Sequence, residues 1–589
     1  MGRFSNIDKS KYVSYNEETN ESTCLECSKK FKGQVLHNIK RHYSTVHKRN
    51  FGNNPSAKSA NKIKIELKQH EFIKCCVGLV TVKAIPFRLF DDEEYFQKLI
   101  KPYESAFNIK VNSRNIVSKL DLCAGLMRNH LKELLENKMV CIKLDIASRL
   151  DKSVLGVNIQ IIQNFKIEIF TLGMVELKKR HTASFLKEEI LNCLNKFDIK
   201  ATQIYSSTTD NGSNVIKTSE LLQEQDNVEC DEYEEIHNRL SSVMSVVRCA
   251  VHTLQLCAHD VYKTHKNELA VCREATRSLR KIIRNNYVDE DIRMPTLDNA
   301  TRWNSTFDML TSLLDLRTFV NDHAICCEVN WDFIQNFVYA FKPVSECTKS
   351  LQTDSYTIGD FYRDWLLCEA QLENIQSNEF AIHLLQSMQS RKTKLLENNA
   401  FNAALYMDRR FNYMDSPFLN EIQKKQAVTH IINTSAILSS LEGCTEIGSD
   451  SEIDHAEQVQ VFDDKYDLLE RKANSITQQS VQVSQNIQSL RQKLEGLAHQ
   501  SKMPFNTDII NYWKNLQIPE PTLSKLSQII LSVPSSQTSV ERAFSALSLI
   551  LTKHRSRLSS ENLNNLLFIK LNENLFKNIN LDVASDVQF

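Results

Sequence analysis

Residues 534–576 decide the interpretation of the chain: PSSQTSVERAFSALSLILTKHRSRLSSENLNNLLFIKLNENLF. A turn of small residues precedes Glu541-Arg542, and apolar residues then recur at helical spacing (Phe544, Leu547 and Leu551). After a basic cluster at 553–557, Ser559 opens a second stretch with apolar residues at helical spacing. This spacing predicts a packed pair of helices. It does not explain an acid and a base among small residues in front of an apolar face.

Residues Glu541 to Ser545 read Glu-Arg-Ala-Phe-Ser. The block resembles the C-terminal dimerisation region of hAT-family transposases, in which a small-residue run is followed by Glu-Arg-x-Phe-Ser. The resemblance implies that Glu541 is the third acidic catalytic residue and that part of the apolar stripe packs against a second protomer. It therefore directs attention to two further acids upstream and to a DNA-reading module.

The composition limits the class of protein. A chain of 589 residues is too long for one core, so several domains are expected. Its 72 basic and 72 acidic residues cancel, so nucleic-acid contacts must come from local patches. Few glycines and prolines favour a helix-rich chain. Sixteen cysteines in so long a chain do not fit a small disulfide scaffold. Without an apolar run of about 18 residues, no membrane span is predicted, and an intracellular, reducing compartment is expected.

Residues 1–60 carry the spacing of a Cys2His2 zinc site. Cys24 and Cys27 are followed, after fourteen residues, by His42 and then, after four more, by His47. Zinc prefers four thiolate or imidazole ligands in a tetrahedron, and such a site orders a segment too short to hold a core. We expect the cysteines on a knuckle and both histidines on one helix; His37 is an alternative to His42.

Basic residues surround these ligands, and no acid occurs from residue 28 to 50. Such a patch suits phosphate contact, so four of its members are predicted to bind DNA: Lys40, Arg41, Lys48 and Arg49. The stretch resembles a BED-type zinc finger, a DNA-binding module often attached to hAT transposases. Residues 61–135 then read as a polar linker and a helical connector of structural role, ending in an amphipathic helix over 115–137.

Residues 136–260 predict a sheet. Alternation in MVCIKLDIAS (139–148) indicates a strand, and two more strands follow over 154–162 and 166–174. A helix over 181–197, capped by Thr182 or Ser184, then leads to a strand ending at Asp210. Three strands, a helix and a strand is the order of an RNase H-like fold, in which acids on the first and fourth strands are neighbours. KLDIAS and TTDNGSNV also resemble the two upstream acid motifs of hAT transposases.

Asp145, Asp210 and Glu541 are therefore the candidate catalytic set. In-line attack on a phosphodiester is served by two Mg²⁺ ions about 4 Å apart, and hard cations prefer carboxylate oxygens. The alternative is that Asp145 is a surface acid and Asp210 a helix N-cap. Asp151 replaces Asp145 if the strand assignment is wrong.

Residues 261–500 predict a large helical insertion that ends in an acidic and polar linker from 444 to about 490. Arg302-Trp303 resembles the hAT motif that opens this insertion, which implies a tryptophan stacked on a flipped base; a core tryptophan is the alternative. At its edge, Cys249, His252, Cys257 and His259 form either a second zinc site or one face of a packed helix. Residues 501–589 are expected to complete the core and to form the dimerisation region.

The sequence thus predicts an α/β plus all-α protein: a zinc finger, an RNase H-like core interrupted by a helical insertion, and a C-terminal helical dimerisation region. Two functions remain open. One is a DDE-type transposase that cleaves and joins double-stranded DNA with Mg²⁺ or Mn²⁺. The other is a non-catalytic, dimeric zinc-finger DNA-binding regulator of transcription. The resemblance implies a zinc-bearing homodimer or higher homo-oligomer in the nucleus.

Overall fold

The computed structural model describes residues 10, 12–33, 35–48, 67–210, 212–223, 243–287, 292–299, 303–353, 355–375, 377–443, 485–555 and 557–581. Contacts divide the chain into two units, Met1–Lys68 and Gln69–Phe589. Within the described ranges, no helix combines the length and the apolar character needed to cross a membrane. The cysteines described there are free thiols.

The first unit is a small three-stranded sheet followed by one helix. Strands β1 (Val13–Asn16), β2 (Glu21–Cys24) and β3 (Lys30–Lys32) form an antiparallel sheet, and helix α1 (Leu36–Thr45) follows. Its core holds five buried residues: Tyr12, Val13, Cys24, Ile39 and Tyr43. So small a core needs further stabilisation, as a bound metal provides. The spacing had predicted both histidines on one helix. Helix α1 ends at Thr45, so His42 lies on it but His47 lies beyond its end.

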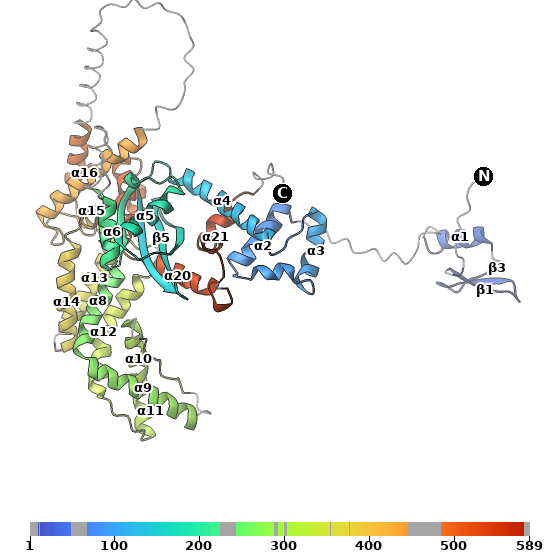
Figure 1. Ribbon diagram of the computed structural model, residues 1–589, viewed down its shortest axis with the longest axis horizontal. Coiled ribbons are helices and arrows are strands. Elements are labelled where there is room, and N and C mark those ends of the chain that lie inside the picture. The colour runs from blue at the N-terminus through green and yellow to red at the C-terminus, as the bar shows by residue number, and fades with distance from the viewer. Residues whose placement is uncertain are drawn as a thin grey trace, which may run out of the picture. The chain divides into compact units, whose positions relative to one another are not determined.

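The second unit contains a mixed sheet of five described strands (Figure 1). They are β4 (Val140–Arg149), β5 (Lys152–Gln163), β6 (Lys166–Leu177), β7 (Ile204–Thr209) and β8 (Ser245–Arg248). The order is β6-β5-β4-β7-β8; β4, β5 and β6 pair antiparallel, whereas β7 and β8 run parallel to β4. The alternation had predicted β4 to β7, but not β8, whose four residues are too few for a pattern.

Helices from two distant parts of the chain pack against the sheet or join its strands. Helix α5 (Ala183–Asn195) connects β6 to β7 and is capped by Thr182, as predicted, and α6 (Ser213–Gln223) follows β7. Helices α20 (Thr538–Ile550) and α21 (Ser560–Leu571) pack on β4, β5 and β6. The short helix α22 (Glu573–Asn578) follows.

The segment predicted as a connector belongs to the same unit as the C-terminal helices. It forms α2 (Gln69–Thr81), the 3₁₀ turn η2 (Phe87–Asp91), α3 (Phe96–Phe107) and α4 (Asn115–Leu135). Helices α2 and α4 pack against α21, and the Asn565 amide donates to Asp121 Oδ1 at 2.8 Å. This segment therefore packs directly against the C-terminal helices and is not only a spacer.

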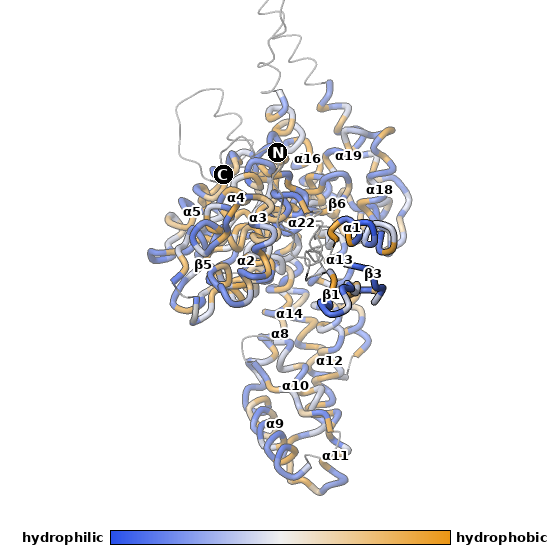
Figure 2. Tube along the Cα trace, turned by 90° about the vertical axis from the view of Figure 1, so that its right-hand side faces the viewer, coloured by the Kyte–Doolittle hydropathy of each residue, from blue (hydrophilic) through white to orange (hydrophobic). Residues whose placement is uncertain are grey.

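The stretch after β8 is helical throughout its described residues, as predicted. It comprises α8 (Ala250–Thr264), α9 (Lys266–Asn286), α10 (Trp303–Asp315), α11 (Arg317–Asp322), α12 (Trp331–Ser350), α13 (Ile358–Glu373), α14 (Glu379–Leu395), α15 (Asn399–Tyr406) and α16 (Glu421–Gly443). Helices α8, α12 and α14 pack together and extend away from the sheet, with α9, α10 and α11 at the far end (Figure 1). Hydrophobic and hydrophilic residues alternate along them, as expected for helices with one buried face (Figure 2).

Three further helices return the chain to the sheet. Of the predicted acidic linker, residues 444–484 lie outside the described residues, but 485–498 are helical, so the linker ends earlier than predicted. Helices α18 (Ile509–Asn515) and α19 (Pro521–Ile530) follow.

A buried charged cluster joins the helical region to this return. Arg410 contacts Asp408 at 2.6 Å and Asp360 at 2.7 Å, and Arg410 and Asp408 are almost fully buried. The neighbouring Arg409 donates to the Ser501 carbonyl oxygen at 2.9 Å. Since buried charges are retained only when paired, this cluster fixes how 408–410 meets the return segment.

Candidate metal centre and acidic site

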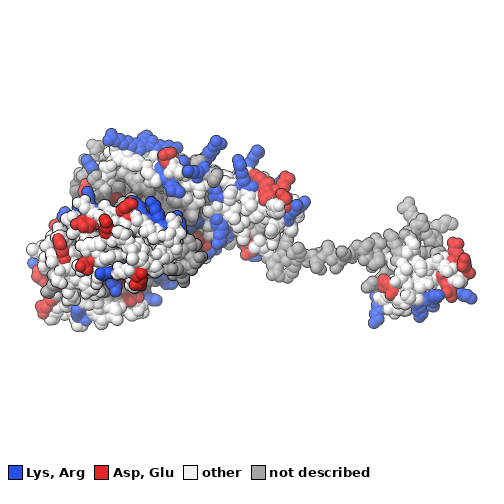
Figure 3. All heavy atoms as spheres, turned by 90° about the horizontal axis from the view of Figure 1, so that it is seen from below, with Lys and Arg blue, Asp and Glu red and all other residues white. Residues whose placement is uncertain are grey.

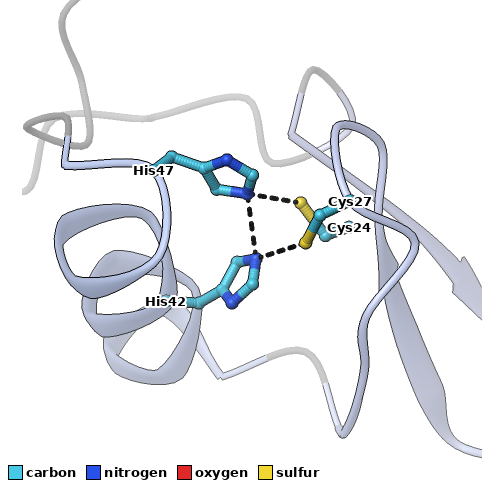
Figure 4. A group of neighbouring side chains, drawn as sticks. All are labelled: Cys24, Cys27, His42 and His47. Carbon is cyan, nitrogen blue, oxygen red and sulfur yellow. Dashed lines mark hydrogen bonds between the residues drawn. The ribbon is translucent and has the colours of Figure 1, made fainter.

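Cys24, Cys27, His42 and His47 converge in the first unit (Figure 4). Cys24 Sγ lies 3.4 Å from His47 Nε2, Cys27 Sγ lies 3.3 Å from His42 Nε2, and the two Nε2 atoms are 3.2 Å apart. A zinc tetrahedron with Zn–S of about 2.3 Å and Zn–N of about 2.0 Å has edges of roughly 3.3–3.8 Å. The donor set and its dimensions therefore fit a structural Zn²⁺. His37 is not part of the cluster.

Two residues outside the predicted ligand set support this centre. The Glu26 carboxylate lies 3.2 Å from His47 Nδ1, so it orients the imidazole with Nε2 toward the sulfurs. Burial raises the pKa of the Cys24 thiol, but the hydrogen bond with the Tyr43 hydroxyl and the backbone hydrogen bonds of Cys27 and Glu26 outweigh it and lower that pKa to about 6. This favours the thiolate that zinc requires. Neither Glu26 nor Tyr43 was predicted, because carboxylate–histidine contacts follow no fixed spacing.

The predicted DNA-binding residues of the finger are exposed where the structure describes them. Lys40 and Arg41 lie on α1 and Lys48 just after it; Arg49 lies outside the described residues. Lys and Arg side chains gather along the lower edge of this unit in Figure 3. Exposed cations on a rigid support are free to contact phosphates.

Asp145 and Asp210 lie next to each other in the sheet. Leu144 on β4 pairs with Thr209 on β7, and each acid is the next residue of its strand or loop. The Asp145 carboxylate accepts a hydrogen bond from Ile146 N at 2.8 Å. Burial, followed by the negative charges of Asp210 and Glu541, raises the pKa of Asp145 to about 7. Asp210 also accepts from Gly212 N at 3.0 Å, the turn expected from its alternative role ahead of α6.

A hydrogen-bonded segment, 532–539, delivers Glu541 to the same edge of the sheet. The Gln160 amide donates to the Ser532 carbonyl oxygen at 2.9 Å, and Thr208 Oγ1 donates to the Pro534 carbonyl oxygen at 2.9 Å. The buried Gln537 amide donates to the carbonyl oxygens of Leu144, one residue before Asp145, and of Thr208, two residues before Asp210. Helix α20 begins at Thr538, so Glu541 lies in its first turn and is exposed.

Gly156 allows this helix to approach the sheet. It pairs with Asp145 across β4 and β5. A Cβ atom at this position would lie 2.5 Å from Val540 Cγ1 and 3.4 Å from the Phe544 ring. Any side chain at 156 would therefore push away the helix that carries Glu541.

The carboxylate oxygens of Asp145, Asp210 and Glu541 are not all within 4.8 Å of one another. The ligand atoms of the zinc-finger cluster do lie within this limit. One Mg²⁺ with oxygens at about 2.1 Å needs ligands within roughly 4.2 Å, but two ions about 4 Å apart accept carboxylates up to about 8 Å apart. One ion held directly by all three carboxylates is therefore not what this arrangement provides. Asp151, the predicted substitute, lies in the β4–β5 turn with a positive φ of 61°.

Two other predicted features have clear structural places. Trp303 opens α10 with a side chain only 3% exposed, packed near Phe341 at 6.1 Å between ring centroids, so it occupies the core. Arg302 lies outside the described residues.

The alternative second zinc site is not formed in the described part of the chain. No group that could hold a metal there includes Cys249, His252, Cys257 or His259, and burial raises the pKa of both thiols to about 11. These residues form the predicted packed helix instead.

Comparison with known proteins agrees with these features. Residues 493–573 match the hAT family C-terminal dimerisation region. The chain is 22% identical over 526 residues to a putative AC transposase of Zea mays, covering 82% of this chain and 62% of that protein. It is 22% identical over 357 residues to zinc finger BED domain-containing protein 4 of Homo sapiens (56% and 29%). It is 23% identical over 435 residues to zinc finger BED domain-containing protein RICESLEEPER 3 of Oryza sativa subsp. japonica (65% and 54%).

A finger-like metal centre and a C-terminal dimerisation region define a zinc-finger protein with a dimerisation module. Residues 493–573 form an hAT family C-terminal dimerisation region, and the chain is similar to a putative transposase and to BED zinc-finger proteins. It spans less than two thirds of the length of each of these relatives.

Proposed function

We propose that this chain is a DNA-binding hAT-type transposase, or a protein derived from one, whose Asp145, Asp210 and Glu541 hold Mg²⁺ or Mn²⁺ for DNA cleavage and strand transfer. The carrying observation is geometric: Leu144 pairs with Thr209, which places Asp145 beside Asp210, and the hydrogen bonds of Gln537 hold the start of α20, with Glu541, against the same strands. Partial burial, together with the charges of Asp210 and Glu541, raises the pKa of Asp145. Bringing like charges together is unfavourable without a cation. Such an arrangement is typical of functional sites.

The strand order supports an RNase H-like assignment for the core. Three antiparallel strands followed by two parallel ones, in the order β6-β5-β4-β7-β8, place the first and fourth strands side by side. The chain departs from a contiguous core because Glu541 arrives 331 residues after Asp210, behind a helical insertion. The hydrogen bonds of Gln537 to β4 and β7 fix where the returning chain meets the sheet.

The chemistry follows from the donors. Divalent ions bound there would stabilise the attacking and leaving oxygens of an in-line displacement at phosphorus. Asp145 must be ionised to bind them, and its raised pKa means that metal binding releases a proton near neutral pH. Gln537 and Gly156 position the three acids. The Gln537 side chain binds to β4 and β7, and Gly156 leaves room for α20, which carries Glu541.

We further propose that the zinc finger contacts double-stranded DNA through Lys40, Arg41, Lys48 and Arg49, that the dimerisation region forms a homodimer, and that the protein acts in the nucleus. The exposed cations support DNA binding, and the match at 493–573 supports dimerisation. For Trp303, a role in base stacking requires α10 to open first, because its ring is buried.

The test is strand cleavage. DNA that binds the protein is selected from a random double-stranded pool and is then incubated with the protein and Mg²⁺. We expect nicks with wild-type protein and at least about 10³-fold less with Asp145→Asn, Asp210→Asn or Glu541→Gln. Asp151→Asn is the matched control and should cleave normally. Cleavage that survives all three changes contradicts the assigned site.

A dimeric, non-catalytic regulator predicts a different result in the same experiment. DNA binding would depend on zinc, yet no cleavage would appear with any DNA or divalent ion. The independent first unit, with its exposed cations, is the feature that this function would use.

A further inference from the structure

A second cluster of metal-binding side chains lies in the helical region, far along the chain from the finger and the acids. His265, Glu379 and His383 each offer a ligand atom, and these atoms lie within 4.8 Å of one another. His265 occupies the junction between α8 and α9, and Glu379 and His383 lie one turn apart at the start of α14. The two histidines are half-buried and Glu379 is exposed.

The two imidazoles are incompletely satisfied. His265 Nε2 and His383 Nδ1 are shielded from solvent and have no hydrogen-bond partner in the described part of the chain. Buried polar nitrogens are normally paired, and each exception requires a reason. The aromatic neighbours of His265, Phe380 at 4.8 Å and Phe333 at 5.8 Å between ring centroids, offer no acceptor.

The cluster continues a polar stripe along α14. Residues four apart lie on one face of a helix, and this face carries Glu379, His383, Ser387 and Arg391. The last two are satisfied by α8, because Ser387 Oγ donates to Asp260 Oδ2 at 2.9 Å and Arg391 Nη2 lies 2.7 Å from the same oxygen. The first two face His265, which follows Asp260 by five residues. Ser387 and Arg391 thus have partners on α8, whereas the ring nitrogens left unpaired in the other half of the stripe have none in the described part of the chain.

We propose that His265, Glu379 and His383 bind a divalent transition-metal ion, with Zn²⁺ as the best fit. Two imidazoles and one carboxylate are a known donor set for zinc, which would keep a further position for solvent on the exposed side. Because the ligand atoms lie no more than 4.8 Å apart, they need to approach by at most roughly 1.5 Å to reach the edge of about 3.3 Å of a zinc tetrahedron.

The bound ion would lock the α8–α9 junction to the start of α14. The backbone at His265 already leaves helical geometry, with φ −118° and ψ 33°, so the two helices meet there at a break. A metal bridge at a break fixes the direction of α9 and of the helices that pack on it. The site is therefore a structural clasp of the insertion, separate from both the finger and the acids.

The test uses the full chain with its finger ligands removed (Cys24→Ser and Cys27→Ser). The finger is a separate unit, so this change leaves the rest of the protein intact. After dialysis against zinc and then against metal-free buffer, elemental analysis should find about one zinc per chain. Adding His265→Ala and His383→Ala should remove it, whereas His252→Ala, on the same helix α8 and from the alternative set, should retain it.

A second variant separates metal loss from misfolding. Glu379→Gln changes an exposed side chain, so the protein should still unfold cooperatively. Zinc should raise the melting temperature of the finger-free protein, and this rise should be lost or clearly smaller in Glu379→Gln. A folded finger-free protein without zinc, equal zinc content in the His265→Ala/His383→Ala protein, or an unchanged zinc-dependent shift in Glu379→Gln would each overturn the proposal.

Discussion

Gly156→Ala tests how the third acid is positioned. The added methyl group would lie 2.5 Å from Val540 Cγ1, whereas carbon atoms in contact are normally about 3.5–4.0 Å apart. Val540 is buried and β-branched, so it cannot turn away, and α20 must move by about 1 Å. Overpacking of this kind costs about 1–3 kcal/mol of stability. The same shift displaces the neighbouring Glu541, and a displacement of 1 Å in a catalytic group lowers the rate by about 10²-fold.

The assay is urea unfolding followed by circular dichroism, together with cleavage of selected DNA in Mg²⁺. Gly125→Ala is the matched control: it lies inside α4, no atom is within 4 Å of an added Cβ, and the change should stabilise the protein by about 0.5–1 kcal/mol. If Gly156→Ala is as stable as Gly125→Ala and cleaves DNA equally well, the close approach of α20 to β5 is wrong.

Three further outcomes are expected. Without Mg²⁺, Asp145→Asn should be more stable than wild type at pH 8, by up to about 4 kcal/mol, because a pKa of about 7 against 3.8 makes the folded carboxylate costly to ionise. The difference in free energy of unfolding between the two proteins should shrink as the pH falls from 7 toward 4. Equal free energies of unfolding in urea at pH 8 would contradict this. Glu26→Gln should weaken zinc binding by about 10–100-fold in chelator competition, because it loosens His47, and unchanged affinity would remove Glu26 from the centre. Arg410→Met should cost about 3–5 kcal/mol in urea unfolding by leaving the buried Asp408 unpaired; a loss below about 1 kcal/mol would mean that the pair is not buried.

Local patterns predicted much of this fold. The alternation through Asp145 located β4, the Thr182 cap located the start of α5, and Ser559 accepts from Asn562 N at the start of α21 as a cap should. The cysteine and histidine spacing predicted the metal centre. These features depend on neighbours in sequence, so one chain suffices to find them.

Features made by distant residues escaped prediction. Gln537 looked like one polar residue in a small-residue run, and its function appears only when its amide meets carbonyl groups nearly four hundred positions earlier in the chain. Gly156 carries no pattern at all, because its importance lies in Val540 on another element. His265 and His383 have no ligand-like spacing, and only the packing of α14 on α8 brings them together.

The central claim is that Asp145, Asp210 and Glu541 surround shared divalent ions. Replacing Mg²⁺ by Fe²⁺ with ascorbate and peroxide generates hydroxyl radicals at the bound ion, which cut the backbone nearby. We expect fragments that end near residues 145, 210 and 541 together. Added Mg²⁺ should suppress them, and they should be absent in Asp145→Asn. Cuts at only one of the three positions, or an unchanged pattern in Asp145→Asn, would contradict it.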